Sequence, residues 1–349
     1  MIGQRDVRSS RSRGRDAARS TPAPAVRQVG RAAGSVAPIV PFSHSTASMG
    51  GRLTIHLDAG EDRLAEARQE CAAVTERVQV WAARLTRFSD TSDLSVLNAD
   101  PRDEVPVRPT LASILRAGRT ATEQSEGLAD ITLLDARLAA EGLTAEEMAA
   151  EQARLGSHAF DWSMAPGRHG SAVVRRSPGL RFDLDGVGKG WIADRALRRL
   201  AAWPSAIVDA DGDLAIRCAS SRTWEVAVDD PRATDTSLVV LRLAATHGVP
   251  GRWGVATSGV SVHRWTVDGR VRHHLIDPRS GLPATTDVVQ ATVIAGSALR
   301  AEVLAKAAVI AGSGAGLALL ERARVQGAVI LTDRGEVMAL PQTLSLLGD

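Results

Sequence analysis

The chain has 349 residues, enough for one large domain or two ordinary ones with a sizeable buried core. Hydrophobic residues make up 44% and charged residues 23% of it, the balance of a soluble globular protein. The formal net charge is +2, but residues 1–44 alone carry eight arginines, so the rest of the chain is slightly acidic. This distribution gives little support to nucleic-acid binding, and no run approaches the roughly 20 apolar residues of a membrane-spanning helix.

Residues 1–44 are rich in Ser, Pro, Gly and Ala and show no apolar periodicity. We therefore expect a disordered basic tail, followed by a single folded domain over residues 45–349. The tail has no apolar run of the kind that a secretory signal peptide needs. The two cysteines, Cys71 and Cys218, lack metal-binding or redox spacing, so we expect buried thiols rather than a disulfide. Together these features predict a cytoplasmic protein.

The first part of the domain predicts one strand and several helices. Apolar and polar residues alternate over 53–57, which is typical of a strand. Apolar residues then recur at spacings of three and four over 61–86, which predicts an amphipathic helix. Two more helices are expected at 110–125 and 135–155, with a polar, turn-rich stretch over 87–109 between the first two helices.

After residue 179 the pattern changes to short β-like runs joined by turns. Expected strands lie at 180–184, 205–209, 213–217, 223–228, 237–243 and 288–295, with two more over 327–340. Expected helices lie at 190–201, 299–311 and 314–324. Because strands and helices do not alternate strictly, we predict an α+β fold, with a mainly antiparallel sheet packed with helices.

A glycine-rich junction over 182–191 combines an expected strand end, a turn and a helix start. Such glycines let the backbone approach a ligand, the helix N-terminus presents free N–H groups to an anion, and Lys189 adds a positive charge. A simple tight turn explains the same residues equally well. The segment is neither a Walker A loop nor a dinucleotide-binding fingerprint.

Three aspartates lie in the five residues 209–213, between two apolar strand runs. Asp-Gly at 211–212 is a strong signal for a type I′ hairpin turn. The same carboxylates suit a hard cation or a ribose hydroxyl. The two interpretations have equal weight at this point.

Two polar segments follow. Thr257, Ser258 and Gly259 predict a polar loop that could hold phosphate oxygens. Further on, 273–281 contains two histidines and then Asp277, which places titratable groups for proton transfer at a loop. His273 and His274 alternate faces if the backbone is extended, so only one of them can point into a site.

Glu302 and Lys306 are four residues apart in an Ala-rich helical segment, with Glu on the N-terminal side. That spacing favours a surface ion pair, which stabilises a helix by a few tenths of a kcal/mol.

The order and spacing of these segments resemble the FAD:protein FMN transferases, or ApbE family, over about residues 45–340. The motifs that carry the resemblance are Met49-Gly50-Gly51, the Ser- and Leu-rich run 85–98, Gly127 to Asp130, Asp185 to Asp194, Thr257-Ser258-Gly259, and His274 to Pro283. The last of these is long and specific. The resemblance implies an ApbE-like fold and transfer of FMN from FAD to a Thr or Ser hydroxyl of an acceptor flavoprotein, with release of AMP.

The resemblance also implies roles for single residues. His274 and Asp277 would supply proton transfer or orientation. The residues expected to bind FAD are Met49, Phe88, Leu128, Ala129, Asp130, Asp185, Lys189, Trp191, Thr257, Ser258, Gly259 and Ile276. Among these, Trp191 would stack on a flat ring. FAD and the acceptor flavoprotein are the expected partners, and no nucleic acid is expected.

The metal site of the family differs most in this chain. By resemblance a backbone carbonyl at Gly188 would join an Asp and, four residues later, a Thr, but here these positions are Glu302 and Lys306. A charged ammonium has no lone pair and repels a cation. Three interpretations follow: Lys306 takes the cation's place, the protein binds FAD without transferring FMN, or Mg²⁺ is kept by Glu302, Gly188 and a nearby Asp, with Lys306 turned outward. FAD hydrolysis to FMN and AMP is a further alternative.

Overall fold

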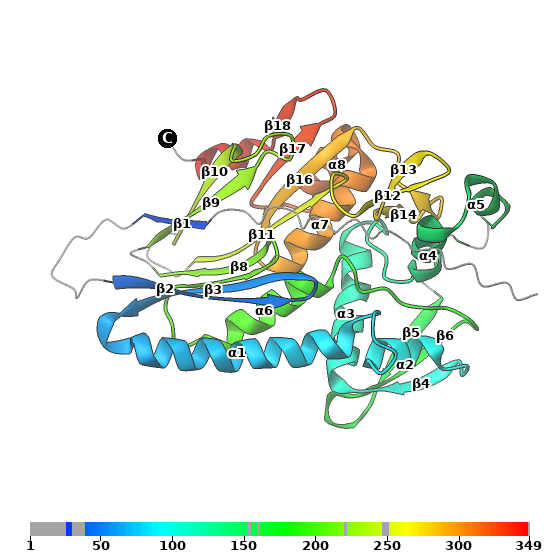
Figure 1. The fold of residues 1–349 in the computed structure, drawn as a ribbon, viewed down its shortest axis with the longest axis horizontal. Helices are drawn as coiled ribbons and strands as arrows, with labels where there is room; N and C mark the ends of the chain where they lie inside the picture. The colour runs from blue at the N-terminus through cyan, green and yellow to red at the C-terminus, as the bar shows by residue number, and fades with distance from the viewer. Residues whose placement is uncertain are drawn as a thin grey trace, which may run out of the picture.

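The computed structural model describes residues 26–29, 39–151, 155, 157–158, 161–219, 222–245 and 251–347. An eight-stranded sheet forms the centre of the molecule (Figure 1). Its strand order is β18-β17-β16-β11-β8-β7-β3-β2, and every neighbouring pair is antiparallel. The strands are β2 Ile39–Ser48, β3 Gly51–Gly60, β7 Ala206–Ala210, β8 Asp213–Cys218, β11 Gly251–Gly259, β16 Val288–Ala295, β17 Gly327–Thr332 and β18 Val337–Ala339. The predicted α+β class with a mainly antiparallel sheet is confirmed.

Helices cover one face of this sheet, each beneath its own strands (Figure 1). Helix α1 (Leu64–Leu85) packs on β2 and β3, α6 (Gly188–Arg199) on β7 and β8, and α7 (Ala298–Ala311) on β11 and β16. The predicted stripe of α1 is buried as expected. Helix α8 (Ser313–Arg322) packs on α7 and β17. This layer encloses α7, which is why α7 is buried on nearly every side.

The other face of the central sheet carries a second, three-stranded sheet. It consists of β9 (Thr223–Asp229), β10 (Ser237–Ala244) and β1 (Val26–Val29), paired antiparallel in the order β1-β9-β10. Ile207, Leu214 and Ile216 of the central sheet share a buried cluster with Trp224 and Leu241 of this second sheet. The middle strands β7 and β8 are therefore buried on both faces.

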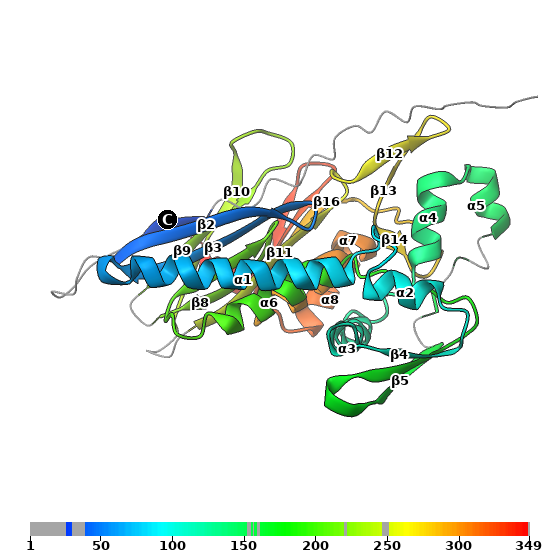
Figure 2. The same ribbon diagram turned by 60° about the horizontal axis from the view of Figure 1, so that its bottom comes forward.

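The remaining elements gather at one end of the sandwich, on the right in Figures 1 and 2. They are α2 Asp93–Ala99, α3 Pro109–Gln124, α4 Leu134–Gly142, α5 Ala145–Glu151, the sheet β4-β6-β5 (Glu104–Val107, Ala172–Arg176, Trp162–Pro166), and the hairpins β12 Arg264–Val267 with β13 Arg270–His273 and β14 Ile276–Asp277 with β15 Leu282–Pro283. Helix α4 contacts β12 and β15, so residues far apart in sequence meet there.

Several predicted elements differ from the observed ones. No strand forms at 180–184, because the backbone N–H and C=O of Phe182 pair with the side-chain amide of Asn98 at 2.8 Å each instead of with a strand. The helix expected over 135–155 is two helices, α4 and α5. The break is a capping box, in which Thr144 and Glu147 each accept a hydrogen bond from the other's backbone N–H.

The polar stretch expected over 87–109 contains α2 and β4. Ser92 begins α2, because its Oγ accepts the backbone N–H of Ser95 at 2.9 Å. Strands β5, β6, β11, β12 and β13 were not predicted. Helix α6 begins at Gly188, slightly before the expected start.

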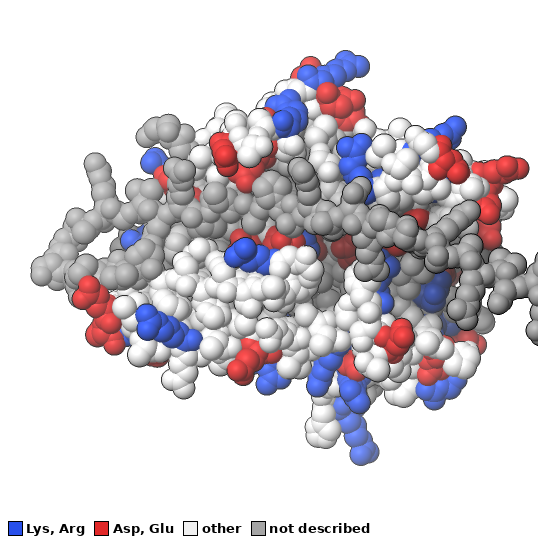
Figure 3. All heavy atoms as spheres, viewed as in Figure 1, with Lys and Arg blue, Asp and Glu red and all other residues white. Residues whose placement is uncertain are grey.

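The N-terminal boundary also differs from the expected one. Strand β2 begins at Ile39, ahead of the expected domain start at residue 45, and Val26–Val29 forms β1 against β9. The other residues of the expected tail lie outside the described residues. Cys71 and Cys218 are buried, unpaired thiols, as predicted. Within the part of the chain that the structure describes, no helix is long and apolar enough to cross a membrane. In the view of Figure 3, basic and acidic side chains of the described residues are interspersed.

Candidate functional site

Three of the motif segments (127–130, 185–194 and 274–283) and Lys306 converge on a small cavity between α4, α7 and the turn that precedes α6. Its volume is about 10 Å³. The lining residues are Asp130, Leu133, Arg137, Asp183, Asp185, His274, Ile276 and Lys306. Five of the expected site residues therefore meet here: Asp130, Asp185, His274, Ile276 and Lys306.

Asp185 is the centre of the charge in this cavity. One of its carboxylate oxygens, Oδ2, is 3.1 Å from Nη1 of Arg137, and its backbone carbonyl accepts a hydrogen bond from Nζ of Lys306 at 2.8 Å. Burial alone would raise the pKa of Asp185, but Arg137 and Lys306 outweigh it and hold the pKa well below its usual range. Asp185 is therefore an ionised carboxylate between two cations.

Arg137 also closes the cavity. Its Nη1 donates to the backbone carbonyl of His274 at 3.0 Å, and its Nε donates to Glu141 at 2.8 Å. Its side chain is almost fully buried, beside the ring of Trp265. Arg137 is not among the site residues expected from the sequence. The signal that could have found it is a charged residue on the otherwise apolar face of α4, formed by Leu133, Ala136 and Ala140.

Asp130 is held by hydroxyl groups. Its carboxylate accepts hydrogen bonds from the backbone N–H and hydroxyl of Thr132, and from the hydroxyl of Ser157 at 2.5 Å. Leu128 and Ala129 precede it, and Ala129 is buried in the core. Asp183 accepts the backbone N–H of Asp185 at 3.0 Å, and burial raises its pKa. The cavity thus has acidic walls formed by two separate segments.

A second group of carboxylates lies behind the α6 turn, around Lys189. Glu302 accepts the backbone N–H of Gly190 at 2.9 Å, and Lys189 forms an ion pair with Asp211 at 3.2 Å. Burial raises the pKa of Glu302 to about 7 and raises that of Asp213 well above its usual value. Burial alone would lower the pKa of Lys189, but the carboxylates of Asp213 and Asp211 raise it instead. Lys189 is thus the cation of this group.

The turn at Asp211-Gly212 connects β7 and β8. Both residues have positive φ, 58° and 97°, as a type I′ turn requires. The carboxylate of Asp211 lies directly against Gly51 of the β2–β3 turn, and a Cβ at Gly51 would clash with it. The prediction of a hairpin turn is confirmed, and the same residue is the ion-pair partner of Lys189.

His274 and Asp277 do not contact one another through any hydrogen bond among the described residues. Nδ1 of His274 is buried and has no hydrogen-bond partner among them, and burial lowers the pKa of His274 well below its usual value. Asp277 instead binds Arg279, at 2.7 Å between Oδ2 and Nη2. His273 lies beside the backbone carbonyl of Ala284 at 3.0 Å. Of the two histidines only His274 lines the cavity, as the alternation predicted.

Several residues expected near FAD lie elsewhere. Trp191 is in the core, edge-on to Trp81 at 5.9 Å between ring centroids, so it presents no free face for stacking. Thr257, Ser258 and Gly259 are not in a loop: they are paired with β16 in strand β11. Phe88 is 83% exposed. Met49 has φ 55° in the β2–β3 turn and packs on the core.

The side chains at the expected metal position do not suit a divalent cation. Among the described residues, no group of three or more His, Cys, Asp or Glu side chains is arranged to hold a metal ion. Lys306 points inward onto the Asp185 carbonyl, and Glu302 is bound to Gly190. The inward position of Lys306 is contrary to the interpretation in which it turns outward and leaves room for Mg²⁺.

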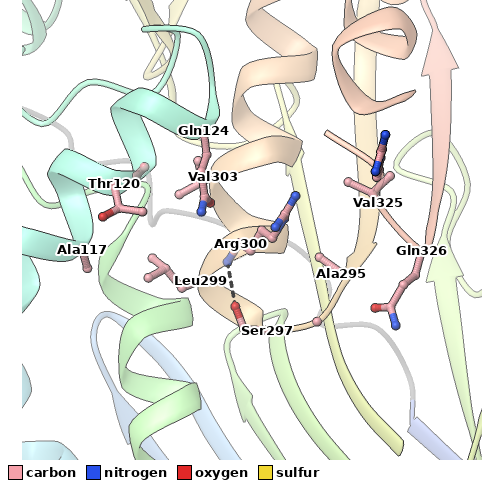
Figure 4. A pocket seen from close by; sticks show the side chains of 13 residues that line it. Ala117, Thr120, Gln124, Ala295, Ser297, Leu299, Arg300, Val303, Val325 and Gln326 are labelled. Carbon is pink, nitrogen blue, oxygen red and sulfur yellow. Dashed lines mark hydrogen bonds between the residues drawn. The ribbon is translucent and has the colours of Figure 1, made fainter. Parts of the chain in front are cut away.

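A larger cavity, of about 450 Å³, lies elsewhere, between α3, the start of α7 and the ends of β16 and β17 (Figure 4). Ser297, Arg300 and Arg324 are among its lining residues. The first backbone N–H groups of α7 are already occupied there, since Asp194 accepts those of Ala298 and Leu299 and Ser297 accepts that of Arg300. None of the expected site residues lines this cavity.

Comparison with known proteins gives concordant results. The model of the ApbE family matches residues 49–331. An FAD:protein FMN transferase of Treponema pallidum is 32% identical over 156 residues, 41% of this chain and 41% of that protein. One of Escherichia coli K12 is 25% identical over 270 residues, 74% of this chain and 69% of that protein. The chain thus spans about two fifths of the length of the Treponema relative.

Solved structures show the same fold. An ApbE protein of Thermotoga maritima has a TM-score of 0.75 at 21% identity, and the match covers 89% of this chain and 100% of that one. The flavinyl transferase ApbE of Pseudomonas stutzeri, in its apo form, has a TM-score of 0.72 at 24% identity, with 89% and 98% covered. Since the family model covers residues 49–331, which include every motif segment and all of the residues that line the small cavity, the chain belongs to the ApbE family.

Proposed function

We propose that the protein is an FAD:protein FMN transferase, which moves FMN from FAD to a Thr or Ser hydroxyl of an acceptor flavoprotein. The observation that carries the proposal is the convergence of Asp130, Asp185, His274 and Lys306 on one cavity. Three of them come from separate motif segments and Lys306 comes from α7, and together they provide carboxylates, a neutral imidazole and a cation. Since the two buried thiols suit a reducing compartment, we place the reaction in the cytoplasm.

In this reaction the acceptor hydroxyl oxygen bonds to the phosphorus on the FMN side of the pyrophosphate. The bond from that phosphorus to the bridging oxygen breaks, AMP leaves with the electron pair, and the hydroxyl proton goes to a base. Nδ1 of His274 is buried without a hydrogen-bond partner among the described residues, and the pKa lowered by burial keeps the imidazole neutral. A neutral imidazole at this point is able to accept the proton.

The nucleotide requires the cavity to open. About 10 Å³ holds roughly one water molecule, whereas ligand pockets are on the order of 300–1,000 Å³. Arg137 is the side chain that bridges the cavity, from Asp185 to Glu141 and the carbonyl of His274. We propose that this guanidinium moves out of the cavity when FAD enters.

The test is incubation of the full chain with FAD, MgCl₂ and a purified acceptor flavoprotein. Intact mass and in-gel flavin fluorescence should show a covalent FMN increment, with release of AMP in equal amount. His274→Ala should lower the transfer rate about 100-fold or more, because it removes the proton acceptor. His169→Asn, at an exposed His in the turn between β5 and β6, is the control and should transfer normally.

Two results would contradict the proposal. One is the absence of both FAD binding and AMP release. The other is AMP release without any covalent flavin on the acceptor, which would identify hydrolysis of FAD instead.

A further inference from the structure

The chain uses lysine in an unusual way. Its sequence contains 40 arginines but only two lysines, Lys189 and Lys306. Both lie beside the Asp185 turn: Lys306 donates to the Asp185 carbonyl, and Lys189 lies among the carboxylates behind the turn. Everywhere else this protein takes its positive charge from guanidinium groups. The two lysines of the sequence thus lie at one turn.

The difference between the two groups is physical. An ammonium is a compact point charge with three donors that rotate freely, while a guanidinium is a broad planar fork. The ammonium of Lys306 lies close to the backbone of the turn that precedes α6. Gly186 has φ +105°, and a Cβ there would lie 2.6 Å from Nζ of Lys306. The missing side chain at Gly186 thus forms a recess that holds the ammonium against the backbone.

The ammonium occupies the kind of position that a bound cation would take. Nζ of Lys306 is 2.8 Å from a backbone carbonyl oxygen and lines a cavity that contains Asp185 and Asp183. Lys306 has no carboxylate partner among the ion pairs of the described residues, whereas Lys189 is paired with Asp211. A divalent cation bound to the same carbonyl oxygen would be repelled by the ammonium group of Lys306.

We propose that Lys306 is a built-in counter-charge for the pyrophosphate of the flavin nucleotide, so that the protein binds FAD and transfers FMN without a divalent cation. The identity of the nucleotide rests on the proposed function. The amine keeps all its protons throughout. It donates N–H bonds to the phosphate oxygens while the acceptor oxygen bonds to phosphorus and the bond to the AMP oxygen breaks, and the hydroxyl proton passes to His274.

The first experiment measures FAD affinity of the full chain by flavin fluorescence, in EDTA and in excess MgCl₂. The two dissociation constants should agree within about threefold, and metal analysis of the purified protein should find less than stoichiometric Mg²⁺. An affinity loss of about tenfold or more in EDTA, equivalent to about 1.4 kcal/mol, would overturn the proposal.

The second experiment uses the small number of amines. Acetic anhydride labels lysines, and peptide mass spectrometry separates Lys306 from Lys189 and from the N-terminus. With FAD present in EDTA, Lys306 should be protected from acetylation by about tenfold, because its Nζ is hydrogen-bonded to phosphate. Labelling of Lys306 that saturating FAD leaves unchanged would contradict a contact between the amine and the nucleotide.

Variants complete the test. Lys306→Met, which keeps length but removes charge, should weaken FAD binding in EDTA about tenfold to hundredfold, since it removes a hydrogen bond from a charged donor. Arg322→Met, at an exposed ion pair with Glu126, is the matched control and should leave affinity unchanged. The double variant Glu302→Asp with Lys306→Thr should bind FAD in a Mg²⁺-dependent manner. If Lys306→Met and the double variant both bind FAD in EDTA as tightly as the parent protein does, Lys306 is not the counter-charge.

The outcomes separate the two proposals. FAD binding and AMP release that both require Mg²⁺ would overturn the role of Lys306 and leave the transferase function intact. Absence of FAD binding in both buffers would overturn the two together.

Discussion

Lys189 and Lys306 lie on opposite sides of one turn and meet different surroundings. Lys189 is paired with Asp211 and lies in the field of Asp213 and Glu302, which are buried behind the turn. Lys306 donates to one neutral carbonyl oxygen and lines the cavity. The first amine compensates for buried carboxylates, and the second keeps its charge available for a ligand. The comparison shows that identical side chains a short distance apart can serve the fold and the site respectively.

The largest expected effect is a difference in the free energy of unfolding between variants of the two lysines. Lys189→Met leaves Asp213 and Glu302 buried without their cation, and at pH 8 it should lower the free energy of unfolding by about 3 kcal/mol. Lys306→Met removes one hydrogen bond to a carbonyl and should lower it by about 1 kcal/mol. Urea denaturation at a fixed protein concentration measures both. Equal losses would show that the two amines do not differ in this way.

The carboxylates behind the turn predict a pH dependence of the protein's stability. Burial is the main cause that raises the pKa of Glu302 from 4.5 to about 7. The charge of Asp185 also raises this pKa, whereas the charges of Lys189 and Lys306 lower it. The folded protein therefore binds the carboxyl proton of Glu302 more tightly than the unfolded chain does. The contribution of this proton to the free energy of unfolding is full below about pH 4.5 and is lost as the pH rises through about 7.

Glu302→Gln should remove that slope. The amide oxygen still accepts the N–H of Gly190, but the group no longer ionises. Between pH 5 and pH 8 we expect the free energy of unfolding to change by about 2 kcal/mol less in the variant than in the parent protein. Urea denaturation at several pH values measures the difference. Parallel pH profiles would show that Glu302 does not titrate in this range.

Much of this arrangement could be predicted from sequence periodicity and motif order. The apolar stripe of α1 and the Asp-Gly turn were predictable, because each depends on residues close in sequence. The resemblance to the ApbE family correctly predicted the fold. It also singled out Asp130, Asp185 and His274, which meet at the cavity although their functional roles stay predictions.

Other features depend on contacts between distant segments. Trp191 is in the core because Trp81 of α1 packs against it, a contact that no local pattern in either segment reveals. Thr257 to Gly259 has the composition of a loop but pairs with β16 as part of the central sheet. The side-chain amide of Asn98, 84 positions away in sequence, takes the hydrogen bonds that a neighbouring strand would otherwise make to the backbone of Phe182. The position of Arg137 depends on how α4 docks on the β14–β15 hairpin.

The smallest expected effect concerns Arg137. Like Lys306, Arg137 contacts Asp185, but its guanidinium is engaged in contacts within the protein and is not available to a ligand. Its guanidinium bridges Asp185, Glu141 and the carbonyl of His274. If the closed cavity must open before FAD enters, the apparent affinity is reduced by the fraction of molecules that are open. Arg137→Ala should then raise the association rate of FAD by about threefold to tenfold in stopped-flow fluorescence. Glu141→Gln weakens only one of the three contacts and should change the rate in the same direction by less. Slower association in Arg137→Ala would mean that this guanidinium attracts the nucleotide instead of blocking it, and that the cavity has two available cations where we infer one.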